Sequence, residues 1–291
     1  MNMNLRTFAV IALVTAFCFS SALVASDKAP PKFYAFAVEA GVRGVKPRAL
    51  PEQAAMLRNI GFDGMGDLFW LDGQLEPNLH TLDAAGLQLY LLQAGIDISP
   101  KAAAPYDKRL PNAIRKLKGR SVTVVVTIHG LQPGDPAGVE PAVRALRELG
   151  DVAAETGVRV SVYNHVNSWA ESVPFIVEVV RKVSHPQVGF NFNLYHWLKV
   201  DGDKDYRPLL RDNVAKLFSV IICGSQVGAS TWVNGIIQPL DKGDFDNRKL
   251  LAMLDEMGYH GPIGLMCYAI PDDPREHLTR SMNVWRSWFA K

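Results

Sequence analysis

Cysteine is scarce in this sequence, which has three in 291 residues. Cys18 falls in an N-terminal segment that we expect to be removed, so Cys223 and Cys267 remain. Two cysteines are too few for a disulfide framework, even in an oxidising compartment. They could form one bridge, but both lie in apolar, strand-like stretches, which favours two buried thiols. Stability must then come from a hydrophobic core, which the 48% apolar composition can supply.

The chain also lacks an excess of either charge. Its 31 basic and 29 acidic side chains give a formal net charge of +2, and loss of Arg6 with the N-terminal segment would leave +1. This near-neutrality gives no electrostatic basis for binding nucleic acid or an anionic membrane. We expect a small or weakly charged partner, and the composition specifies no oligomeric state.

Motifs of several enzyme classes are missing. There is no G-x-S-x-G turn for a serine hydrolase, and neither Cys223 nor Cys267 has a histidine close in sequence. Lys199 and Lys242 are not accompanied by a glycine-rich loop at a helix start, so no phosphate site is predicted.

The N-terminal segment has the pattern of an export signal. Arg6 precedes an apolar run over 8–19, and small residues follow it. We expect residues 1–26 to be a signal peptide, cleaved near Ser26, and the protein to be exported to the periplasm or the extracellular space. The alternative is an uncleaved anchor, although the run is short for a bilayer span. No stable membrane insertion is expected after cleavage.

The rest of the chain alternates short β-rich runs with longer amphipathic stretches, which is typical of an α/β barrel. Its length suits one (β/α)8 TIM barrel domain over 30–291. The expected strands are 33–38, 65–68, 87–92, 121–128, 159–163, 188–192, 218–223 and 263–267. The expected helices include 50–60, 137–156, 175–183, 209–217, 247–257 and 274–289.

Two expected strands end in polar clusters. VRVSVYNH (158–165) ends in Tyr163, Asn164 and His165, and VGFNFNLYH (188–196) carries Asn193 and His196. Parallel barrel strands deliver such side chains to one site, so both histidines are expected in loops at a pocket. Neither cluster contains a carboxylate.

These and four other segments carry a resemblance to a known family. LPEQAAMLRNIGFDG, DAAGLQLY, VRVSVYNH, VGFNFNLYHWLK, QPLDKGDFD and GYHGPIGLMCY occur in this order. The chain resembles the sugar phosphate isomerase/epimerase family, the xylose isomerase-like TIM barrels. The resemblance implies an aldose–ketose isomerase or epimerase, in which two glutamates, an aspartate and a histidine hold a divalent metal. The metal stabilises an enediolate while a carboxylate moves the proton.

The family's metal-binding positions have lost their charge in this sequence. The resemblance places Tyr163 and Met266 where the family has glutamates, and Asn193 where it has aspartate. The histidine would fall near Ile221, where the sequence has none. A phenol, an amide and a thioether do not suit a hard divalent ion, so we expect the ordinary metal site to be absent.

Three accounts of this loss remain open. In one, the protein still acts on a neutral sugar or polyol, with His165 and His196 as acid and base and with Tyr163, Asn164 and Asn193 binding hydroxyls. In another, the barrel only binds a carbohydrate, using the aromatic residues Trp169, Tyr195, Trp197 and Trp232. In the third, Mn²⁺, Mg²⁺, Co²⁺ or Zn²⁺ is held by relocated ligands, drawn from Glu39, Asp67, His129, His165 and His196.

Four further residues are candidates for substrate binding, each with a plainer interpretation. Glu39 could bind a hydroxyl or only pair with Arg43 at the surface. Asp67 ends the second strand, and His129 either caps the fourth strand or enters the pocket. Trp197 could stack on a sugar ring, although aromatic residues in such a barrel more often pack.

Overall fold

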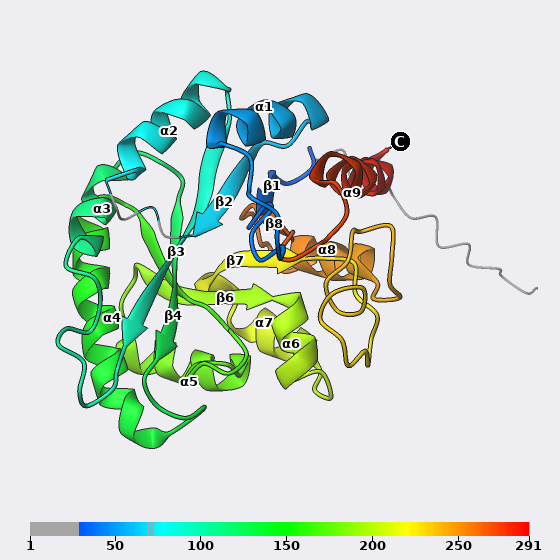
Figure 1. Ribbon diagram of the computed structural model, residues 1–291. Helices are drawn as coiled ribbons and strands as arrows, with labels where there is room; N and C mark the ends of the chain where they lie inside the picture. Colours follow the sequence, from blue (N-terminus) through cyan, green and yellow to red (C-terminus); the bar gives the residue numbers. More distant parts are fainter. Residues whose placement is uncertain (1–28, 69, 71–72, 291) are drawn as a thin grey trace, which may run out of the picture. The chain divides into compact units, whose positions relative to one another are not determined.

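Eight parallel strands close into a barrel in which each strand pairs with its neighbours in sequence order and β8 returns to β1 (Figure 1). The computed structural model describes residues 29–68, 70 and 73–290; the signal peptide expected over 1–26 lies outside them. The barrel belongs to the unit Pro30–Ala290. The strands are β1 Phe33–Phe36, β2 Gly64–Leu68, β3 Gln88–Asp97, β4 Thr123–His129, β5 Arg159–Val162, β6 Val188–Asn193, β7 Leu217–Ile222 and β8 Ile263–Met266.

Helices follow the strands and surround the barrel, so the expected (β/α)8 fold is confirmed (Figure 1). They are α1 Leu50–Ile60, α2 Leu75–Ala84, α3 Leu110–Lys116, α4 Val139–Ala154, α5 Val173–Val183, α6 Leu194–Val200, α7 Tyr206–Asp212, α8 Asn247–Glu256 and α9 Pro274–Phe289. Short 3₁₀ turns, Pro136–Gly138 and Val214–Lys216, precede α4 and β7. No helix among the described residues is both long and apolar enough to cross a bilayer.

Several expected boundaries are wrong, each for a local reason. The first strand stops at Phe36 because Ala37 has φ 58°, outside the extended region. The third strand continues to Asp97 because it pairs with β4 as far as His129. The single helix expected over 209–217 is replaced by α7, a 3₁₀ turn and the start of β7.

The sequence prediction missed α6, which begins directly after β6. Asn193 caps it, since the side-chain oxygen accepts a hydrogen bond from the Tyr195 backbone N–H at 3.2 Å. His196 and Trp197 therefore lie in a helix rather than in a loop.

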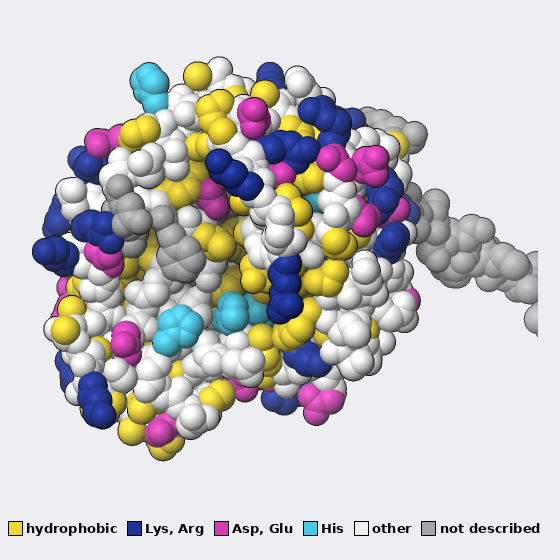
Figure 2. Space-filling model, viewed as in Figure 1, with side chains coloured by type: hydrophobic (Ala, Val, Ile, Leu, Met, Phe, Trp, Pro, Cys, Tyr) yellow, Lys and Arg dark blue, Asp and Glu magenta, His cyan; other side chains and the backbone are white. Residues whose placement is uncertain are grey.

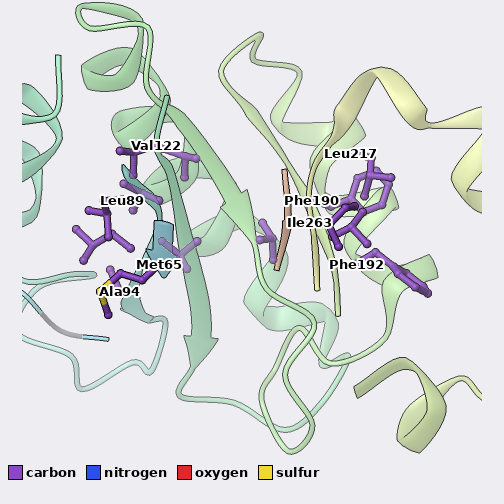
Figure 3. Close-up of a cluster of buried hydrophobic side chains, with 14 of the residues drawn as sticks. Met65, Leu89, Ala94, Val122, Phe190, Phe192, Leu217 and Ile263 are labelled. Atoms are coloured by element: carbon purple, nitrogen blue, oxygen red, sulfur yellow. The ribbon is translucent and has the colours of Figure 1, made fainter. Parts of the chain in front are cut away.

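The core has two layers because side chains alternate along each strand. One layer lies between the strands and the helices; Figure 3 shows part of it, including Met65, Leu89, Phe190 and Phe192. The other fills the barrel interior and includes Tyr34, Phe36, Tyr163 and Met266. Alternation thus directs the last inward-facing residue of each strand toward the carboxyl end of the barrel, where sites form in this fold.

Cys223 and Cys267 are buried and free, as expected from their apolar surroundings. Burial raises the pKa of the Cys223 thiol to about 12. Both side chains are therefore neutral thiols and act as small apolar residues.

Candidate active site

A cavity of about 620 Å³ opens at the carboxyl ends of the strands, and its volume is ordinary for a small-molecule site. Figure 2 shows histidine side chains within the hollow of this face. The connection from β7 to α8 contributes Trp232, Val233 and Ile237 to its wall (gold in Figure 1). Helix α6 supplies Tyr195 and His196, and the barrel strands and their loops supply Phe36, Ala37, Leu68, Gln93, Thr127, His129, Tyr163, His165, Val166, Asn167, Met266, Tyr268 and Ala269.

The titratable side chains of this cavity are of two kinds. No aspartate or glutamate belongs to the described lining, and its titratable groups are imidazoles and phenols. A larger hollow of about 1150 Å³ lies between α1 and α2, away from the strand ends. We assign the candidate site to the smaller cavity because it lies where inward-facing side chains of several strands converge.

The backbone of one residue, Val166, connects the two histidines that the sequence singles out. The Val166 N–H donates to Nδ1 of His196 at 3.2 Å, and the Val166 carbonyl lies 2.8 Å from Nδ1 of His165. A carbonyl only accepts, so Nδ1 of His165 carries the proton and its Nε2 presents a lone pair. In His196 the assignment is reversed: Nδ1 accepts and Nε2 carries the proton. The two rings lie 4.3 Å apart between centroids.

Both imidazoles are held neutral. Burial lowers the pKa of His165 below its ordinary value, and the neighbouring His129 lowers it further against the opposing effect of the Val166 carbonyl. Burial, followed by repulsion from His165, holds the pKa of His196 well below its usual range. At neutral pH His165 is therefore a free base.

His196 differs from His165 in exposure. Its ring is buried, and Nε2 has no hydrogen-bond partner among the described residues. It packs on Tyr195 with centroids 3.7 Å apart. His165 is only partly buried and lines the cavity, and the described residues make no hydrogen bond to its Nε2.

Asn193 fixes the hydrogen bonding of the Tyr163 hydroxyl. Because Oδ1 of Asn193 accepts from the α6 backbone, its Nδ2 must point the other way, and it donates to the Tyr163 hydroxyl at 2.6 Å. Tyr195 also hydrogen-bonds to Tyr163. This bond acts to lower the pKa of Tyr163 and to raise the pKa of Tyr195, which is the pattern expected when Tyr195 is the donor. Burial still raises the pKa of Tyr163 far above its ordinary value. The hydroxyl thus accepts twice and keeps its own proton.

The structure brings only some of the expected substrate-binding residues to the cavity. Tyr163, His129, His165 and His196 line it. Asn164 and Asn193 lie beneath it and bind each other: the Asn193 backbone N–H donates to Asn164 Oδ1 at 2.9 Å. The two amides therefore support the floor, and Asn193 acts through Tyr163.

The remaining expected contacts lie outside the lining. Glu39 pairs with Arg48 and not with Arg43. Asp67 accepts from the Trp70 indole at 2.7 Å, and burial raises its pKa. Trp197 is buried between Phe192 and Tyr206, so its role is packing.

Sequence reasoning missed several polar lining residues, among them Gln93 and Thr127. They face each other from β3 and β4, and Gln93 Nε2 donates to the Thr127 hydroxyl at 2.9 Å. Gln93 falls one residue beyond the expected end of its strand at 92. Alternation on a longer strand was the signal that could have placed it in the pocket.

The donor set does not fit the family's divalent metal. Oδ1 of Asn193 is engaged at the start of α6, Nδ2 is a donor, and the Met266 thioether suits only soft ions. Glu39 and Asp67, the carboxylates of a relocated site, are engaged by Arg48 and Trp70. Within the part of the chain described, no three histidine, cysteine or acidic side chains converge as metal ligands.

Comparison with known proteins places this geometry in a family. The chain is 25% identical over 232 residues to 3-dehydroshikimate dehydratase of Pseudomonas putida, covering 74% of this chain and 35% of that enzyme. The chain thus spans about a third of the length of this curated relative.

Solved structures show the same fold. The 3-keto-D-glucoside 4-epimerase of E. coli superposes with a TM-score of 0.69 at 18% identity, over 89% of this chain and all 100% of that one. D-allulose 3-epimerase from Methylomonas sp., in complex with D-allulose, gives a TM-score of 0.67 at 14% identity, over 89% and 98%. The pattern of the xylose isomerase-like TIM barrel matches residues 54–288. The chain belongs to the xylose isomerase-like TIM barrel family, as the sequence resemblance indicated.

Proposed function

We propose that this protein is an exported enzyme of the isomerase/epimerase type that acts on a neutral carbohydrate without the family's metal-binding carboxylates. The observation that carries the proposal is the pairing of a neutral base, Nε2 of His165, with a phenol, Tyr163, on one cavity wall. Their ring centroids are 5.9 Å apart. Relatives named as epimerases of sugars and as a dehydratase support this reaction class.

The proposed chemistry is proton transfer at a carbon next to a carbonyl. Nε2 of His165 takes the proton, and the electron pair left on carbon moves into the carbonyl to form an enolate. The Tyr163 hydroxyl donates its free proton to this oxygen as a hydrogen bond, as preorganised neutral donors do at enolate sites. Return of the proton by His165 to the neighbouring carbon, with transfer of the proton of that carbon's hydroxyl to the former carbonyl oxygen, gives the isomer. Return to the original carbon, after the enolate has turned its other face toward His165, gives the epimer.

His196 takes a different role from the acid or base expected from sequence. Its ring lines the cavity, but its Nε2 is buried and has no hydrogen-bond partner among the described residues, whereas His165 is partly exposed. Nδ1 of His196 accepts from the Val166 N–H, and the carbonyl of the same residue sets the tautomer of His165. We therefore assign His196 as a positioning residue.

A carbohydrate-binding protein without catalysis is the second candidate. The aromatic side chains of Tyr195, Trp232 and Tyr268 line the cavity, and aromatic faces suit the apolar face of a sugar ring. Lys199 Nζ lies 5.6 Å from the Trp232 ring centroid and restrains it.

Deuterium exchange separates the two candidates. The mature protein is incubated with a panel of neutral ketoses and aldoses in D₂O, exchange is followed by NMR, and affinity by calorimetry. We expect exchange that His165→Gln abolishes while affinity stays within about tenfold. His80→Gln, on α2 and away from the cavity, is the control. Binding without exchange in the wild type would establish the binding protein, and no binding of any sugar would refute both.

Export is tested separately by expressing the full chain and fractionating the cells. We expect a product in the periplasm or medium whose N-terminus, read by mass spectrometry, lies near residue 27. An intact N-terminus in the membrane fraction would contradict the proposal.

A further inference from the structure

We propose that the ligand is a disaccharide or glycoside, with its second ring in an adjoining cavity along the extended ends of β3 and β4. This inference rests on the proposed function, since it concerns the same site. It assigns a second subsite and the size of the ligand.

The adjoining cavity measures about 470 Å³ and shares one residue with the first. His129 lines both, at the end of β4. The other lining residues come from the end of β3 and the segment after it: Gly95, Ile96, Asp97, Ser99, Ala104, Pro105, Tyr106, Asp107, with Gly130 after β4. Each cavity is large enough for a sugar ring, so the two together suit a ligand longer than a monosaccharide.

The register of β3 and β4 makes the wall that joins the cavities. Gly95 pairs with Thr127, and Asp97 pairs with His129. Because residues two apart on a strand share a face, Gly95 and Asp97 lie on the same face as Gln93, which lines the first cavity. A ligand ring above Gln93 and Thr127 can therefore continue along this face toward Asp97.

Gly95 leaves this path open. A Cβ built on it would meet no described atom within 4 Å, and its φ is not positive, so the backbone does not require glycine there. Glycine weakens the interior of a strand, and in that position it often marks the close approach of a ligand. Every other residue on this face of β3 and β4 has a side chain.

The second cavity offers groups that suit hydroxyls. Oδ1 of Asp97 accepts from the Ser99 backbone N–H at 2.8 Å, and Oδ2 has no hydrogen bond from the described residues. The His129 ring likewise has no hydrogen-bond partner in the described part of the chain. Asp107 is ion-paired with Arg109, so the carboxylate of Asp97 is the group that disfavours a phosphate or other anionic group, and the second ring is neutral.

Calorimetry with matched sugars tests the subsite. The probes are D-glucose and D-fructose, and the disaccharides cellobiose, maltose, trehalose and sucrose. Proteins are the wild type, Gly95→Ala, Gly95→Val, and Gln88→Val as a control that places valine at the opposite, exposed end of β3. We expect at least one disaccharide to bind about tenfold or more tightly than its monosaccharide. The ratio should fall in Gly95→Ala, reach about one in Gly95→Val, and stay at the wild-type value in Gln88→Val.

Thermal unfolding first shows that each variant is folded. Equal affinity for monosaccharides and disaccharides in the wild type would overturn the subsite and leave the proposed function standing. A disaccharide preference that persists in Gly95→Val would also overturn it. Failure of all six sugars to bind, confirmed with the wider panel of neutral sugars used for the exchange experiment, would refute the proposed function itself.

Discussion

Replacing His196 with phenylalanine should leave the fold as stable as before, or more stable, while impairing His165. Two opposing effects determine the free energy of unfolding. Removal of the buried Nε2–H, which has no described partner, should stabilise the fold by about 1–3 kcal/mol. Loss of the acceptor for the partly buried Val166 N–H should cost about 1 kcal/mol. Phenylalanine keeps the ring contacts with Tyr163 and Tyr195.

The net change at pH 7 is therefore about 0 to +2 kcal/mol, which corresponds to about 2–4 °C in Tm for each kcal/mol. The gain should grow in acid. His196 has a lowered pKa in the folded protein, so below pH 6.5 the unfolded chain binds a proton that the folded chain does not. Wild-type stability falls as a result, and at pH 5.5 the variant should gain about 1.4 kcal/mol more.

Denaturant unfolding at pH 7 and 5.5 measures the stability, and ¹⁵N NMR of the imidazoles reports the tautomer of His165. We expect the Nδ1–H form in the wild type and a mixture in the variant, with a fall in turnover. His196→Asn is the matched control, because its amide oxygen can still accept from Val166. A loss of more than about 1 kcal/mol in the phenylalanine variant at pH 7 would show that Nε2 is hydrogen-bonded in solution, and would refute the reasoning.

Three of the four other predictions concern the candidate site, and one concerns His277, a buried residue of α9. Tyr163→Phe removes the acceptor of the buried Asn193 amide, so denaturant titration should show a loss of about 1–3 kcal/mol together with weaker sugar binding; unchanged stability would contradict that hydrogen bond. Activity should fall in acid as His165 is protonated, with a midpoint below 6.5 in the pH profile of kcat/KM, whereas a midpoint above 6.5 would contradict a neutral base. Burial lowers the pKa of His277 to about 4, so between pH 6.5 and 4 the unfolded chain binds a proton that the folded chain does not. The free energy of unfolding should therefore drop by about 3 kcal/mol over this range, and this pH dependence should be reduced in His277→Leu. Added Mn²⁺, Mg²⁺, Co²⁺ or Zn²⁺ should leave the Tm unchanged, and mass spectrometry of protein purified without chelator should find no stoichiometric metal; a bound ion would mean that ligands other than those considered hold it.

The barrel could be predicted because its determinants are local in sequence. Runs such as 121–128 are apolar enough to be buried on both faces, and the stretch over 50–60 has helical spacing that gives α1 with the same ends. Boundaries that depend on pairing were less accessible. The extension of β3 to Asp97 exists because β4 lies beside it, and nothing within 93–97 indicates a strand by composition.

The sequence by itself determined that Tyr163, Asn193 and Met266 carry no carboxylate, at positions where the family resemblance implies metal ligands. Only the tertiary structure decided how the side chains at the site are hydrogen-bonded and charged in the absence of those carboxylates. Hydrogen bonding at Tyr163 and His165 depends on partners distant in the chain. The Asn193 amide donates to the Tyr163 hydroxyl, 30 residues earlier, and His196 accepts from the N–H of Val166, whose carbonyl orients His165. Burial, which sets the charge of these imidazoles and phenols, likewise arises only when all eight strands close.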